Sequence, residues 1–273
     1  MKPSLLTLGI AARAAAAAGG VKGHAEVDVL FPRNDTFAPT PLLPIVFAVQ
    51  NPAVARQLNL RLSYRVIPHG RPDAATDYER VRLNALPGDG ATFYAHDLVT
   101  GLLDAEGTWE FFWQLRWNNC TSSSSSSSSS EEHGADGHFA RDTQEPVQSF
   151  IFTTHKGGSE PDLVAVGGED RCGNAQGVGF EVLDVLDVPP PQNADMLTSC
   201  AHLALPAPTP TPCSAAVPSE AAQSISSRIT QAACLAATPV VSCPPEGSAA
   251  GRATVNAAAV ALSLGSVLYV LAL

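Results

Sequence analysis

The chain has 273 residues, of which 26 are acidic and 16 are basic, and its formal net charge at pH 7 is −10. This acidic balance argues against nucleic-acid binding, because that function needs a basic face that neutralises phosphate groups. Hydrophobic residues make up 45% of the chain, which is enough for one domain with its own core.

The N-terminal sequence, MKPSLLTLGIAARAAAAAGGVKGHA, is typical of a secretory signal peptide. Lys2 precedes an apolar stretch, Leu5 to Ala18, which only Arg13 interrupts. Small residues follow, and we expect cleavage after Ala25 in preference to the other candidate positions, which are Ala18, Gly20 and Gly23. Residues 1–25 are therefore predicted to be removed, and the rest of the chain is predicted to be secreted.

Residues 26–190 hold most of the β-branched and aromatic sequence and are predicted to form the folded domain. In LNLRLSYRV the hydrophobic and polar residues alternate, whereas IVFAVQ is apolar on both faces, as in a central strand. Such patterns and the turns between them predict eight strands: Glu26–Phe31, Ile45–Gln50, Leu58–Val66, Arg80–Leu83, Ala91–Val99, Thr108–Asn118, Val147–Thr154 and Val178–Leu186. Without intervening helices, they favour an all-β fold, an antiparallel immunoglobulin-like β-sandwich.

The segment TWEFFWQLRW holds all three tryptophans of the chain, and a strand would place Trp109, Trp113 and Trp117 on one face. A row of exposed aromatic rings would suit carbohydrate stacking, which is the pattern of a carbohydrate-binding module. The opposite face already carries polar residues such as Gln114 and Arg116. We therefore expect the tryptophans to pack in the core.

Two sequons predict N-glycosylation of a secreted chain, Asn34-Asp35-Thr36 and Asn119-Cys120-Thr121. Asn34 lies in a turn-like sequence that should be exposed, whereas disulfide formation at Cys120 would compete with glycosylation of Asn119. Nine consecutive serines, Ser122 to Ser130, follow the second sequon. They are predicted to form a flexible surface loop between two strands that would otherwise make a hairpin.

An even number of cysteines in a secreted chain predicts three disulfides. The six cysteines are Cys120, Cys172, Cys200, Cys213, Cys234 and Cys243. Our preferred pairing joins Cys120 to Cys172 in the domain and the last four among themselves. Residues 191–248 are rich in proline and are predicted to form a disulfide-bearing stalk, with one short helix from Pro218 to Leu235.

The C-terminal sequence combines a cluster of small residues, a short polar spacer and 17 terminal residues without a charge. These three features together are the signal for a glycosylphosphatidylinositol anchor. We expect the anchor on Ser248, with Gly247 as the second choice, and removal of residues 249–273. A plain membrane-spanning tail is the alternative, although no basic residue follows the apolar run.

Searches for catalytic signatures give no candidate catalytic, cofactor-binding or metal residues, because the chain has no G-x-S-x-G, H-E-x-x-H or phosphate-binding glycine loop. One alternative site depends on signal cleavage after Gly23. His24 would then be the N-terminal residue, and its amine and imidazole, with His69 or His96, would suit copper. Cleavage after Ala25 would remove that site.

The segments EVDVLFPRNDTFAPTPLLPIVFAVQNP, WNNC and CGNAQGVGF resemble a family of secreted fungal proteins, the domain of unknown function 7136. The resemblance runs from Glu26 to about Gly247. It implies a surface location and offers no catalytic residues to carry over.

We therefore expect a glycosylated, non-enzymatic structural or binding module without a cofactor, held by a glycolipid at the outer face of a fungal plasma membrane or cell wall. Wall polysaccharide is its candidate partner. The alternatives are a copper-dependent, polysaccharide-acting oxidase-like or copper-binding protein with an N-terminal His24, and a carbohydrate-binding module.

Overall fold

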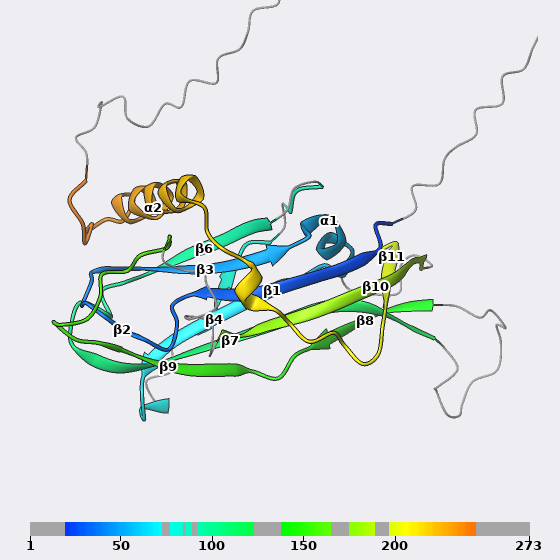
Figure 1. Ribbon diagram of the computed structural model, residues 1–273, viewed down its shortest axis with the longest axis horizontal. Coiled ribbons are helices and arrows are strands. Elements are labelled where there is room, and N and C mark those ends of the chain that lie inside the picture. Colours follow the sequence, from blue (N-terminus) through cyan, green and yellow to red (C-terminus); the bar gives the residue numbers. More distant parts are fainter. Residues whose placement is uncertain are drawn as a thin grey trace, which may run out of the picture.

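The computed structural model describes residues 20–72, 77–83, 86–88, 92–122, 138–164, 175–188 and 197–243 (Figure 1). Most of this part is β-structure. The strands are β1 Gly23–Phe31, β2 Thr36–Phe37, β3 Leu42–Gln50, β4 Arg61–Pro68, β5 Glu79–Val81, β6 Thr92–Thr100, β7 Gly107–Ser122, β8 His138–Gln144, β9 Gln148–Thr154, β10 Gly177–Asp187 and β11 Ser199–Leu203. Two α-helices, α1 Pro52–Ala55 and α2 Ser219–Cys234, and two 3-10 helices, η1 Arg56–Leu58 and η5 Pro212–Ser214, complete the described elements.

Each of the eight predicted strands overlaps an observed strand, so the β-rich prediction is confirmed. Three strands were not predicted: β2 has two residues, β8 is mostly polar, and β11 lies in sequence that had been assigned to the stalk. The predicted strands on either side of the serine run, β7 and β9, pair antiparallel from Gly107 to Trp113, and the unpredicted β8 pairs with β7 from Arg116 to Ser122. Residues 123–130 of that run lie outside the described residues.

The strands form a mixed sheet with the order β2-β9-β7-β11-β10-β1-β3-β6, and β7 also pairs with β4 and β8. Two pairs are parallel, β11 with β7 at Ala201 and Asn119, and β2 with β9. The prediction of a purely antiparallel fold is therefore wrong, and an immunoglobulin-like sandwich is not confirmed. The long strand β7 is the centre of the arrangement, since its two edges carry four other strands.

The hydrophobic core lies where β3 and β7 face one another. The ring of Phe47 on β3 is 6.3 Å from Phe111 and 6.0 Å from Trp113 on β7, measured between centroids. Trp109, Trp113 and Trp117 are 7%, 1% and 8% exposed. The prediction that the tryptophans pack in the core is confirmed, and the alternative in which they form an exposed carbohydrate platform is wrong. Rings this deeply buried have no face left for a sugar.

Residues 197–243 differ from the expected stalk, because they add a strand and a helix to the same domain. β11 pairs with β10, and α2 packs along β6 and β3 with four buried side chains, Ala222, Ile225, Ile229 and Ala233. The helix itself was correctly predicted. Burial of this apolar face stabilises the packing by roughly 25 cal/mol per Å² of apolar surface, which is why the segment does not stand apart.

Disulfides join the C-terminal segment to itself and to the sheet. Cys120 on β7 bonds Cys200 on β11 across 80 residues, and Cys234 bonds Cys243 across nine. The preferred pairing of Cys120 with Cys172 is therefore wrong, because the parallel contact of β11 with β7 brings Cys200 to Cys120 instead. Cys172 lies outside the described residues. The disulfides agree with an extracellular location.

In the part of the chain that is described, no helix is both long and apolar enough to cross a membrane. The proposed anchor residues, Gly247 and Ser248, and the tail after them lie outside the described residues.

Candidate functional site

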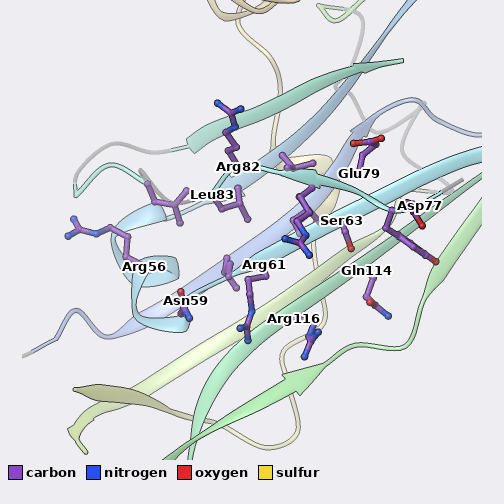
Figure 2. Close-up of a pocket in the computed structure, with 16 residues that line it drawn as sticks. Arg56, Asn59, Arg61, Ser63, Asp77, Glu79, Arg82, Leu83, Gln114 and Arg116 are labelled. Carbon is purple, nitrogen blue, oxygen red and sulfur yellow. The ribbon is translucent and has the colours of Figure 1, made fainter. Parts of the chain in front are cut away.

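A hollow on the described surface lies over the outer face of β4, β5 and β7 and has a volume of about 1280 Å³ (Figure 2). Strand alternation places Leu62 and Tyr64 in the core and turns Arg61, Ser63 and Arg65 outward. The register of β4 with β7 places Arg61 opposite Arg116, Ser63 opposite Gln114 and Arg65 opposite Phe112. The register of β4 with β5 places Ser63 opposite Arg80 as well.

Five arginines line this hollow, which we call the arginine groove: Arg56, Arg61, Arg80, Arg82 and Arg116. They come from η1, β4, the β5 segment and β7, so distant parts of the chain contribute to one surface (Figure 2). The carboxylates in the lining are Asp77 and Glu79. The groove is therefore locally positive although the whole chain carries a net charge of −10.

One end of the groove is held by a charged network. The guanidinium groups of Arg61 and Arg116 each donate to the carboxylate of Asp142 on β8, one to each oxygen. Asn118 connects this pair to η1, because its Oδ1 accepts from Asn59 Nδ2 at 2.9 Å. Charge-assisted bonds of this kind fix the two arginines in place.

Arg65 lies next to the arginine groove, two residues beyond Ser63 on β4, and is held by aromatic rings. Its guanidinium carbon lies 4.8 Å from the ring centre of Tyr78 and 4.7 Å from that of Phe112. A guanidinium in this position is stabilised by the negative ring faces, by about 0.5 to 1 kcal/mol at exposed sites. The stacking restricts the side chain and orders the Tyr78 segment over β4.

The arginine groove therefore offers hydrogen-bond donors and positive charge on paired strands. Arg56, Arg80, Arg82 and Arg116 are exposed, and no ion pair is seen for the first three among the described residues. Neutral hydrogen-bonding groups from Asn59, Ser63 and Gln114 lie between the arginines. This is the chemistry of a binding surface for a polar or anionic ligand.

A second polar cluster is buried under residues 204–218, the segment between β11 and α2 that we call the strap. Glu26 and Asp28 on β1 are both 0% exposed. Glu26 accepts from the Thr211 backbone N–H at 2.6 Å, and Asp28 Oδ2 accepts from Gln50 Nε2 at 2.8 Å. Burial, together with a hydrogen bond to Glu26, raises the pKa of Asp28 to about 8. Because no substrate reaches these carboxyl groups, the cluster serves the fold.

The structure does not bring the three candidate copper-binding histidines together. His24 lies 3.4 Å from Glu26 and 3.8 Å from Glu181, whereas His69 lies 3.5 Å from Glu110 on another part of the sheet. His96 is on β6 and contacts the carbonyl of Tyr94. Within the described ranges, no group of three or more His, Cys, Asp or Glu side chains is arranged to hold a metal ion.

The two predicted glycosylation sites differ in exposure. Asn34 is exposed in the turn between β1 and β2. Asn119 is partly buried within β7, and its side-chain oxygen accepts from Thr143 Oγ1 at 2.5 Å. It also lies next to the Cys120–Cys200 disulfide.

Comparison with family models matches residues 21–243 to the Domain of unknown function (DUF7136). The chain belongs to this family. The match begins just before β1 and ends at Cys243, so it includes β11, the strap and α2 together with the preceding strands. No curated protein and no solved structure shows a significant match.

Sequence reasoning about this DUF7136 domain missed the arginine groove. A usable signal was present, because arginines recur on one face of a strand, four residues apart in RLSYR and two apart in RVR, within an otherwise acidic chain. Those residues were considered only as the polar side of amphipathic strands. Their convergence depends on the pairing of β4 with both β5 and β7, which strand periodicity does not specify.

Proposed function

We propose that this protein is a non-enzymatic binding module of an outer cell surface, and that the arginine groove binds wall polysaccharide. The groove itself carries the proposal, because it is open to solvent and five of its donor residues project from hydrogen-bonded strands: Arg61, Ser63, Arg80, Gln114 and Arg116. Sites on strands keep their geometry better than sites on loops, so little order is lost when a ligand binds.

The surface location is part of the same proposal. Secretion through the N-terminal signal, a glycolipid on Ser248 or Gly247, and glycans on Asn34 and Asn119 would make this an anchored glycoprotein of a fungal wall or plasma membrane. The support is the sequence of both ends and the disulfides, which persist in oxidising compartments. An immunoglobulin-like sandwich also belongs to the proposal, supported by the facing strands β3 and β7.

A carbohydrate ligand suits the composition of the arginine groove. Sugar hydroxyl groups need donors and acceptors at several positions, and Asn59, Ser63 and Gln114 provide both kinds. Tyr78 and Phe112 are partly exposed next to these residues and add ring surface. The carbohydrate site that we propose therefore lies on the face of β7 opposite the tryptophans.

The test is binding of the full chain, purified from a host that processes its ends, to wall polysaccharides in a sedimentation assay and by calorimetry. The double variant Ser63→Ala with Gln114→Ala removes two neutral groups of the groove, and Gln223→Ala on the exposed face of α2 is the matched control. We expect the groove variant to weaken binding by about tenfold, which is 1.4 kcal/mol, and the control to bind normally. Absence of binding to every polysaccharide, or turnover of one of them, would contradict the proposal.

A further inference from the structure

We infer that the arginine groove selects polysaccharides that carry carboxylate groups, that is, polymers containing uronic acid residues. This inference rests on the proposed function, since it names the ligand class of the same site. It goes beyond that function because a polysaccharide-binding surface need not distinguish charged from neutral chains.

The first argument is charge complementarity. Five arginines and two carboxylates line the groove, and Asp142 pairs with Arg61 and Arg116, so the groove keeps a surplus of positive charge on a chain whose net charge is −10. Gathering this many of the chain's 16 basic residues in one hollow has a cost, because like charges repel one another. A neutral glucan would leave that repulsion in place, whereas an anionic chain would relieve it and would be drawn in from solution.

The second argument is that the groove already shows how it holds a carboxylate. Arg61 and Arg116 are cross-strand partners, and each donates to one oxygen of Asp142. Guanidinium groups suit carboxylates because their N–H donors are arranged in a planar fork. Asp142 thus defines the spacing at which this pair of strands binds one carboxylate.

The third argument concerns the neighbouring row, where Arg80 lies opposite Ser63, and Ser63 lies opposite Gln114. Arg80 and the adjoining Arg82 are exposed. A uronate carboxylate at this row would meet a guanidinium, while hydroxyl groups of the same sugar would reach Ser63 and Gln114. This row lies two residues along β4 and β7 from the pair Arg61 and Arg116. A polysaccharide chain that lies along the groove would therefore meet donors from both rows in turn.

The groove favours a hydrated sugar chain over an acidic peptide. Ten of its 16 lining residues are charged or polar, and the apolar Leu62 and Val81 are 2% and 6% exposed. Arg65, stacked between Tyr78 and Phe112, likewise presents a rigid polar group. Peptide recognition usually depends on pockets for apolar side chains, whereas most side chains of this lining match hydroxyl and carboxylate groups.

Calorimetric titration of the processed full chain with oligogalacturonides, neutral β-1,3-glucan oligomers and poly-glutamate tests the inference. We expect the uronate to bind at least about tenfold more tightly than the other two, equivalent to 1.4 kcal/mol, and its affinity to fall as salt is raised. The double variant Arg80→Gln with Arg82→Gln should weaken uronate binding by about tenfold. Arg228→Gln, which removes an exposed charge on α2, is the matched control and should change binding by less than about twofold.

A second variant, Gln114→Glu, places a carboxylate in the groove without removing an arginine and should weaken uronate binding more than neutral binding. Thermal melts of each variant check that the fold persists. Equal binding of uronate and neutral glucan, or binding of the glucan alone, would overturn the inference and leave the proposed function standing. Equal binding of poly-glutamate, or equal effects of the groove and Arg228 variants, would also overturn it. If no polysaccharide binds, both the inference and the proposed function are wrong.

Discussion

Glu26 and Asp28 lie two residues apart on the same face of β1, and both carboxyl groups are completely buried beneath the strap. Thr211 in the strap donates its backbone N–H to Glu26, and Ser214 donates to Gln50, which in turn donates to Asp28. Gly177 on β10 makes room for this cluster, since a Cβ there would lie 2.4 Å from Asp28 Oδ1. The pair therefore connects the first strand to the segment that leads into α2.

The buried pair predicts a stability that falls with rising pH. The pKa of Asp28 is about 8 in the folded protein, because burial and the hydrogen bond to Glu26 both disfavour its ionised form. Its pKa is about 3.9 in the unfolded chain. The folded state therefore binds more protons between these values. The stabilising contribution is fully present below pH 4 and is lost as pH rises through about 8.

Urea unfolding at pH 5, 7 and 9 measures this effect. We expect the free energy of unfolding to decrease by roughly 1 kcal/mol per pH unit over the range up to pH 8. The variant Asp28→Asn, which mimics the protonated side chain, should flatten this dependence, and Glu160→Gln at an exposed position should leave it unchanged. A wild-type protein that is equally stable at pH 5 and pH 7 would contradict the assignment of the raised pKa.

The start of β1 predicts where the signal peptide is cut. Gly23, His24 and Ala25 pair with Val182, Glu181 and Phe180 on β10, and Ala25 is 1% exposed. Cleavage after Ala25 would delete these pairs and would create an α-amino group at the buried Glu26. The structure thus favours the upstream candidates, Ala18 and Gly20, over the position that the sequence pattern favours.

N-terminal peptide mass spectrometry of the secreted protein gives the position directly. We expect a mature chain that begins at Gly19 or Val21. A start at Glu26 would contradict this prediction. A start at His24 would also contradict it, and would make copper titration of that N-terminus the next measurement.

Local sequence patterns were sufficient for most of the strands but not for the site. In LNLRLSYRV hydrophobic and polar residues alternate, and this alternation identifies β4 because successive side chains of a strand point to opposite faces of the sheet. The arginine groove requires residues 61, 80 and 116 to meet, which depends on the register of three strands. Likewise, Cys200 reaches Cys120 only through the single parallel contact of β11 with β7. Neither relationship is encoded in the period of any one segment.

The exposure of the two sequons predicts unequal glycosylation. Asn34 is exposed, whereas the side chain of Asn119 is partly buried, bonded to Thr143, and next to a disulfide. Peptide mapping after enzymatic deglycosylation in ¹⁸O water should therefore find Asn34 converted to aspartate in most molecules and Asn119 in few. The variant Asn34→Gln should remove most of the glycan mass. Similar occupancy at both positions would show that glycosylation precedes closure of β7 against β8.

The two observed disulfides are predicted to differ in their effect on stability. Cys120–Cys200 closes a loop across 80 residues and Cys234–Cys243 closes one across nine. In the chain-entropy model the longer loop restricts the unfolded state more, so the first bond contributes about 4.5 kcal/mol and the second about 2.6 kcal/mol. The double variant Cys120→Ser with Cys200→Ser should consequently lower the free energy of unfolding by about 2 kcal/mol more than Cys234→Ser with Cys243→Ser.

Denaturant unfolding of both variants, with the wild-type protein as reference, measures this difference. Non-reducing peptide mapping of the wild-type protein should first identify both bonds, together with a third between the two remaining cysteines, Cys172 and Cys213. Because Cys120–Cys200 is the covalent link between β7 and β11, its loss should also loosen the strap that β11 leads into. Backbone amide exchange at Thr211 should then accelerate in the Cys120–Cys200 variant and not in the other. Equal destabilisation by the two variants would mean that the unfolded chain gains no more freedom from the long loop than from the short one.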